Sequence, residues 1–272
     1  MAYRRPWGES KLIETILGSI ENIGTQARRA VAGVGRYTLL LQSFLYWLVH
    51  RPVRISLLFK QLEFVGNKSL SIIFLSGLFT GAVLGLQIGK IFAIFKAEGM
   101  MGAATGKSLA LELAPVMCGF IVSGRAGAAM AAEIGTMRVN EQLDAMEAMG
   151  VDPVSYLVVP RIMGATLMMP ILSVIFLGVG LVGCLVVGVF MFNIDFAVFN
   201  QQLKWLVWVE DIQKGMIKAT FFGFILSSVS CYKGFHAKGG AKGVGEATTQ
   251  AVVVSLLSIL ISDFFISLIQ LS

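Results

Sequence analysis

The sequence predicts an all-α polytopic membrane protein with five transmembrane helices. Two observations lead to this fold class. Hydrophobic residues make up 56% of the 272 residues, and the mean hydropathy is +0.78. Charged residues make up only 14%, whereas a soluble domain carries about 25%. Too few polar side chains remain to cover a globular surface, which excludes ordinary soluble enzymes, disordered proteins and secreted disulfide scaffolds.

Residues 1–68 are predicted to form cytoplasmic and interfacial amphipathic (elbow) helices ahead of the membrane domain. This part carries ten Lys or Arg residues against four acidic ones. Its apolar run, Tyr37–Val49, is too short to span a bilayer, because a span needs about 17–25 residues. Its aromatic side chains suit the headgroup layer. Arg51 and Pro52 are expected to end this helix, and Val53–Phe64 to form a second amphipathic piece that enters the membrane.

Residues 69–272 contain five apolar segments long enough to span. The third is over-long for a perpendicular span at about 1.5 Å per residue, so it should be tilted or broken near Pro170. The N-terminal segment and the loops on its side carry fifteen Lys or Arg residues, against five on the other side. We therefore expect a cytoplasmic N-terminus and a periplasmic C-terminus. The predicted spans are 69–92, 108–132, 160–192, 215–232 and 247–271.

Glycine recurs every fourth residue in the first predicted span, at Gly77, Gly81, Gly85 and Gly89. This spacing places the four glycines on one helix face. A face without side chains predicts close packing against another helix.

Several motifs point away from nucleotide, metal or redox chemistry. Residues 102–108 (GAATGKS) have one residue too few between the glycines for a phosphate-binding loop, and no strand precedes them. The chain is therefore expected to hydrolyse no nucleotide and not to be an enzyme itself. Only two histidines are present, so no metal site or cofactor is expected. The three cysteines, Cys118, Cys184 and Cys231, lie in apolar stretches and are interpreted as small buried hydrophobes.

Charged residues inside predicted spans are the strongest chemical signal, because burying charge in hydrocarbon is costly. Glu112 and Arg125 lie in the second span and Asp263 in the fifth. Gln87, among the glycines of the first span, is a weaker candidate. These residues either form structural ion pairs and helix caps or line a cavity that meets a polar headgroup.

The segment 133–160 between the second and third spans predicts an acidic amphipathic helix over about 136–150. Thr136 can cap its start, and Gly150 with the Asp152-Pro153 pair can end it. An apolar edge runs along Leu143, Met146 and Met149. Such a coupling helix could dock into a groove on another protein, or it could be a solvated surface helix.

Four stretches together resemble the MlaE family of ABC-transporter permeases. They are ELAPV at 112–116, SGRAGAAMAAEIGTMRVNEQLDAMEAMGVDP at 123–153, VVPR at 158–161 and GGAKGVGEATTQAVV at 239–253. The resemblance covers roughly residues 60–270. One position departs from some proteobacterial members, which carry Arg directly before the cavity glutamate where this chain has Leu111.

The resemblance implies a homodimeric permease in the bacterial inner membrane that moves phospholipids between that membrane and the outer membrane. Implied partners are a separate ABC ATPase subunit, an MCE-domain protein that forms a lipid conduit, and a small STAS-type accessory subunit. Arg125 and Asp263 are interpreted as structural intramembrane charges. The implied lipid cavity comprises Glu112, Gln87, Leu84, Ile88 and Leu111. The implied ATPase-docking residues are Glu141, Asp144, Met146, Glu147 and Met149.

Two other functions remain open from the residues alone. An ion-coupled secondary transporter would use Glu112 and Asp263 as a proton relay, although no inverted repeat is visible. A membrane scaffold without a transport role would need neither carboxylate.

Overall fold

The computed structural model describes residues 7–50 and 54–271, and all regular elements among them are helices. The chain divides into two compact units, Met1–Tyr46 and Trp47–Ser272. The first unit holds most of α1 (Trp7–His50), a helix of 44 residues that includes the predicted interfacial segment 37–49. The predicted break at residues 51–53 lies outside the described residues.

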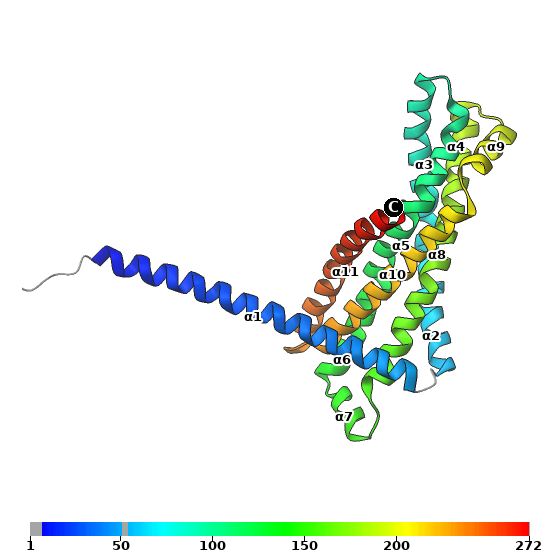
Figure 1. The fold of residues 1–272 in the computed structure, drawn as a ribbon. Coiled ribbons are helices and arrows are strands. Elements are labelled where there is room, and N and C mark those ends of the chain that lie inside the picture. Colours follow the sequence, from blue (N-terminus) through cyan, green and yellow to red (C-terminus); the bar gives the residue numbers. More distant parts are fainter. Residues whose placement is uncertain (1–6, 51–53, 272) are drawn as a thin grey trace, which may run out of the picture. The chain divides into compact units, whose positions relative to one another are not determined.

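Among the described residues of the second unit, five helical segments are long and apolar enough to cross a membrane, which confirms the predicted five-span fold class. The first comprises α2 (Ile55–Val65) and α3 (Asn67–Ile94). The second comprises α4 (Met101–Ser108), α5 (Ala114–Val122) and α6 (Ala128–Val139), joined by π-helical turns at Leu109–Leu113 and Ser123–Gly127. The third is α8 (Val159–Phe192), the fourth α10 (Val209–Phe235) and the fifth α11 (Gly240–Leu271). Shorter elements are α7 (Gln142–Ala148), α9 (Phe196–Leu206), a 3₁₀ turn at Glu98–Met100 and a π-helical turn at Val154–Val158. Figure 1 labels the numbered helices.

The glycine face of α3 packs directly against α8. A Cβ atom added at Gly81 would collide with the backbone of Gly180, and one added at Gly85 would lie 3.0 Å from the sulfur of Cys184. The backbones of the two helices therefore touch, and the predicted close helix contact is confirmed. The residues of this face, Gly77, Gly81, Gly85 and Gly89, are all buried.

The core of the second unit lies where α3, α5, α8 and α10 meet. Phe176, Phe222 and Met169 are fully buried there. All three cysteines are buried and free, as predicted. The third span is one unbroken helix of 34 residues through Pro170, which removes the alternative of a break at that proline. A proline inside a membrane helix is tolerated where neighbouring groups satisfy the freed backbone.

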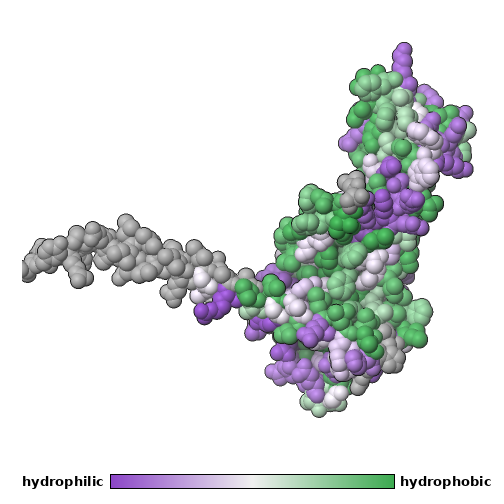
Figure 2. Space-filling view, in the orientation of Figure 1, coloured by the Kyte–Doolittle hydropathy of each residue, from purple (hydrophilic) through white to green (hydrophobic). Residues whose placement is uncertain are grey.

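On the face shown in Figure 2 this unit is largely hydrophobic, and hydrophilic side chains gather at the end that carries α6 and α7 and again toward the opposite end, near α9. Exposed apolar side chains continue along the sides of three spans. Such a surface is expected of a protein whose solvent is lipid. Examples are Phe74, Phe79, Ile171, Val182, Phe264 and Leu268.

The segment predicted as one coupling helix over about 136–150 is divided in the structure. Helix α6 continues to Val139, and the hydroxyl of Thr136 donates to the carbonyl of Ala132, one turn back, so Thr136 is not an N-cap. Glu141 adopts a left-handed conformation with φ 57° and starts the separate helix α7. The predicted start was wrong because Thr136 still belongs to the long second span.

Candidate functional site

The second span has π-helical turns at both places where it carries a charge. Glu112 lies in the turn Leu109–Leu113 and Arg125 in the turn Ser123–Gly127. Pro115 follows the first turn and provides no backbone N–H, which favours a local departure from α-helical bonding. A π-helical turn inserts an extra residue and re-aims the side chains beside it, often at functional sites.

Glu112 faces two other spans and meets a cluster of polar side chains there. The ammonium of Lys218, from α10, lies 2.5 Å from Glu112 Oε2 and 3.2 Å from Asp263 Oδ1. Lys218 also donates to the hydroxyl of Ser267, at 2.7 Å. Asp263 and Ser267 are one turn apart on α11, so they share a helix face. We name Glu112, Lys218, Asp263 and Ser267 the charged cluster.

Ser267 connects the carboxylate of Glu112 with the backbone carbonyl of Asp263. Its hydroxyl lies 3.2 Å from Glu112 Oε1 and 2.8 Å from the carbonyl oxygen of Asp263. A hydroxyl has one proton, so it can donate to only one of these oxygens at a time. The cluster therefore has two ways to distribute a hydrogen bond within the same geometry.

Exposure differs sharply among the three charged side chains. The side chain of Lys218 is 1% exposed, that of Asp263 20% and that of Glu112 46%. Two carboxylates share one ammonium, so the formal charge of the cluster is −1 when both are ionised. That surplus negative charge is offered at the Glu112 side, where a cationic or hydrogen-bond-donating group can reach it. The buried ammonium of Lys218 needs the two carboxylates as partners, because an unpaired charge in a span is costly.

Lys218 is not among the site residues predicted from the sequence. Its signal was a lysine only three residues inside the apolar segment that begins at Gly215. Asp263 was interpreted as structural and Glu112 as a cavity residue, yet both contact the same lysine.

The remaining residues of the predicted lipid cavity are not members of the charged cluster. Gln87 is exposed on α3. Leu84 and Ile88 are half-buried on the same helix, and Leu84 packs against the main core. Leu111 is half-buried next to Glu112. Their assignment to a lipid cavity stays a prediction.

Arg125 is held by the junction between α2 and α3. Its Nη2 donates to the carbonyl of Phe64 at 2.5 Å and to that of Val65 at 3.2 Å, and its Nε donates to the hydroxyl of Ser69 at 2.8 Å. The guanidinium also lies 5.2 Å from the centre of the Phe64 ring. Arg125 therefore satisfies carbonyls at the end of α2 that lack helical partners.

The predicted ATPase-docking residues lie on and beside α7. Leu143 is buried, Met146 is half-buried and Met149 is 72% exposed, so the predicted apolar edge emerges from the protein along the helix. Asp144 is paired with Arg138 of α6 at 2.5 Å. Glu141 and Glu147 are exposed. The Arg138–Asp144 ion pair connects α7 to the end of the second span.

Two further ion pairs lie toward the ends of the spans. Arg161 of α8 binds Glu133 of α6 at 2.9 Å. Lys107, the lysine of the GAATGKS segment, lies 3.7 Å from Asp211. That segment is part of the second span, within α4, so its backbone is helical and not a phosphate-binding loop.

Comparisons with known proteins agree with these observations. The family described as "Permease MlaE" matches residues 58–269. The chain belongs to the MlaE permease family. A probable ABC transporter permease protein of Rickettsia bellii is 38% identical over 93% of this chain and 97% of that protein. The intermembrane phospholipid transport system permease protein MlaE of Haemophilus influenzae is 36% identical over 94% of this chain and 98% of that protein.

A chloroplast member of the comparison extends the likeness beyond bacteria. The chloroplastic protein trigalactosyldiacylglycerol 1 of Arabidopsis thaliana is 37% identical over 76% of this chain and 59% of that protein. The MlaE match includes every member of the charged cluster, Arg125 and the whole of α7.

Proposed function

We propose that this MlaE-family chain is the permease subunit of an ABC transporter that moves phospholipids. The observation that carries the proposal is the charged cluster, which presents a half-exposed carboxylate within otherwise apolar spans. A phospholipid needs an apolar path for its acyl chains and a few polar groups for its headgroup. The name of the Haemophilus relative supports phospholipid as the substrate, and the name of the Rickettsia relative supports the ABC-transporter class.

The proposal includes the partners and the place of action. Two copies of the chain would form the central permease in the bacterial inner membrane, with a cytoplasmic N-terminus and a periplasmic C-terminus. Lipid would pass between that membrane and an MCE-domain conduit toward the outer membrane. A separate ATPase would supply the energy, with no catalytic residue or cofactor in this chain. A small STAS-type subunit could complete the assembly.

We propose α7 as the contact for the ATPase. The helix is short, exposed and acidic, and the Arg138–Asp144 pair connects it to the span that carries Glu112. Movement of α7 on ATP binding could therefore change the second span. Glu147 is the better test than Asp144, since reversing Asp144 would also break the pair with Arg138.

Charge reversal at Glu147 tests this contact. Glu147→Lys should abolish most ATPase co-purification and ATP-driven lipid transfer, because it places a cation in an acidic docking surface. Glu210→Lys is the matched control, since it reverses an exposed glutamate at the start of α10. Normal ATPase binding and activity in the Glu147 variant would overturn the docking assignment.

The charged cluster also favours a second candidate, an ion-coupled transporter, because carboxylates and a lysine from three spans can relay protons. Reconstitution of the purified complex in liposomes of phosphatidylethanolamine and phosphatidylglycerol separates the two. Lipid transfer that needs ATP and its ATPase, and proceeds without a proton gradient, supports the permease. Transfer that persists without any ATPase but stops when the gradient is removed supports the second candidate.

A further inference from the structure

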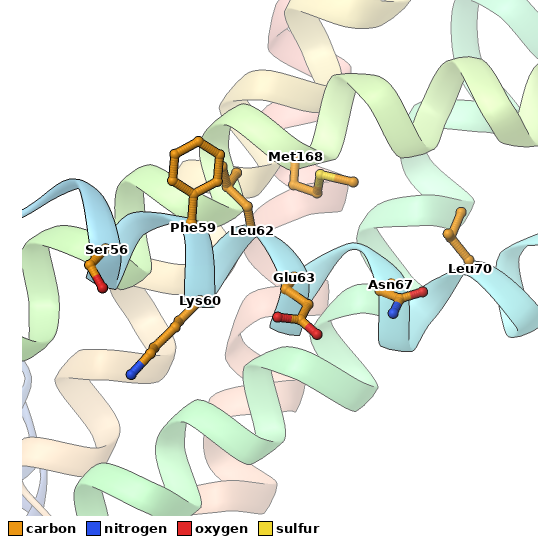
Figure 3. Close-up of a pocket in the computed structure, with 8 residues that line it drawn as sticks. All are labelled: Ser56, Phe59, Lys60, Leu62, Glu63, Asn67, Leu70 and Met168. Carbon is orange, nitrogen blue, oxygen red and sulfur yellow. The ribbon is translucent and has the colours of Figure 1, made fainter.

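A groove lies beside α2, away from the charged cluster. It has a volume of about 770 Å³ and is bordered by α2, the start of α3 and one residue of α8 (Figure 3). This volume is within the range of small-molecule sites. The lining residues are Ser56, Phe59, Lys60, Leu62, Glu63, Asn67, Leu70 and Met168.

The groove has one apolar side and one polar side. Figure 3 shows Phe59, Leu62 and Met168 on one side of α2 and Lys60 and Glu63 on the other. The polar lining residues recur at 56, 60, 63 and 67, which is the spacing of one helical face. An amphipathic helix that leads into a span suits the boundary between headgroups and acyl chains.

Lys60 and Glu63 carry opposite charges one turn apart, and both are exposed. Within the described residues neither side chain makes a hydrogen bond or ion pair. Two other cations of this region are engaged with aromatic rings: Arg54 lies over Tyr156 and Lys68 over Phe64. Lys60 and Glu63 thus offer one positive and one negative group side by side.

The walls of this groove are fixed by close packing. Gly66 lies so close to the methyl end of Met168 that an added Cβ would collide with it. A Cβ added at Gly164 of α8 would come within 2.7 Å of the Gln61 side chain. Arg125 holds the end of α2 through the Phe64 and Val65 carbonyls. The groove is therefore a built feature of the junction between α2, α3 and α8.

We propose that this groove binds a zwitterionic aminophospholipid with the chemistry of phosphatidylethanolamine. Lys60 would bind the phosphate, and Glu63 would accept hydrogen bonds from the primary ammonium. The acyl chains would follow the apolar side past Leu70 and Met168. The proposed site stands apart from the transport function, because it predicts occupancy of the groove whether or not the charged cluster handles lipid.

Photocrosslinking of the full chain, with the subunits that co-purify with it, tests the groove. Benzoylphenylalanine replaces Phe59 in the groove or, as the matched control, Phe79, which is 61% exposed on α3. The complex is placed in nanodiscs of phosphatidylethanolamine and phosphatidylglycerol, irradiated and analysed by mass spectrometry. We expect a phosphatidylethanolamine adduct at position 59, with no preference for that lipid at position 79.

Charge variants then identify the groups responsible. Lys60→Glu or Glu63→Lys should lower the adduct at position 59 by about threefold, the effect of losing one partly exposed charge contact. The double swap should restore most of it, because both charges remain available in reversed order. The adduct at position 79 should stay constant, which shows that each variant is folded. Glu112→Gln should leave the adduct at position 59 unchanged, because Glu112 does not line the groove. A loss of lipid transfer in this variant therefore tests the transport proposal without testing the groove.

Two results would overturn the proposal. An adduct at position 59 that is insensitive to both charge reversals would mean that ordinary bilayer lipid covers the groove. An adduct whose mass is that of a polypeptide would mean that a partner helix occupies it.

Discussion

Glu112 and Arg125 lie on the same span, each on a π-helical turn, yet they are satisfied in opposite ways. Glu112 contacts side chains from α10 and α11 and keeps 46% of its side chain exposed. Arg125 donates to two backbone carbonyls and one hydroxyl at the junction of α2 and α3. Partners of the first kind can rotate or exchange, whereas backbone carbonyls are fixed by the helix that carries them.

This difference separates a group that can meet a ligand from one that positions the scaffold. A carboxylate with side-chain partners and surface access can exchange a contact for a ligand at low cost. A guanidinium whose donors are bound to a helix end cannot do so without freeing that end. Removing Glu112 is thus expected to affect lipid handling, and removing Arg125 is expected to affect stability.

The largest expected effect comes from removing the shared lysine of the charged cluster. Lys218→Met leaves the carboxylates of Glu112 and Asp263 facing each other without a cation inside the spans. Breaking a buried charge network of this kind costs about 3–5 kcal/mol. We expect poor expression and a strongly lowered thermal midpoint in detergent.

A second variant separates charge from packing at this position. Lys218→Met combined with Glu112→Gln removes one charge of each sign and should recover part of the lost stability. If the single Lys218→Met variant were as stable as the parent protein, the lysine would not be holding the two carboxylates together.

Arg125→Lys should cost about 2 kcal/mol of stability, since it keeps the charge and loses the planar fork that reaches two carbonyls and Ser69. The thermal midpoint of the purified protein measures this loss. Lipid transfer per folded complex should stay near that of the parent. A loss of transfer with an unchanged midpoint would instead make Arg125 a functional charge and remove the contrast with Glu112.

Glu112→Gln should show the reverse pattern. The amide oxygen can still accept from Lys218, and the side chain is half exposed, so stability should change by about 1 kcal/mol or less. Lipid transfer or lipid co-purification should fall about tenfold, the effect of one lost charge-assisted hydrogen bond. Gly178→Ala is the control, because a Cβ there meets open space. Equal lipid retention in both variants would remove Glu112 from the headgroup site.

The sequence was enough to predict the membrane fold, because hydropathy and length alone determine whether a helix can span. The glycine spacing likewise predicted the close contact of α3, since the absence of side chains is visible in one segment. The charged cluster was harder to predict because its members come from residues 112, 218, 263 and 267 on three helices. A single charge in a span signals that a partner exists, but only the packing of α10 and α11 identifies Lys218 as that partner.

The smallest expected effect, and the finest test of the comparison, is Ser267→Ala. The variant removes the hydroxyl that accepts from Lys218 and reaches Glu112, but leaves all three charges and their ion pairs. Loss of one such hydrogen bond should lower stability by about 1 kcal/mol. Ser267→Thr keeps a hydroxyl at the same position and serves as the control.

If Glu112 is the group that meets the headgroup, lipid transfer by the Ser267→Ala variant should exceed that of Glu112→Gln, because the carboxylate remains. A loss as large as that of Glu112→Gln would mean that the hydroxyl positions the carboxylate, and the binding unit would then be Glu112 and Ser267 together.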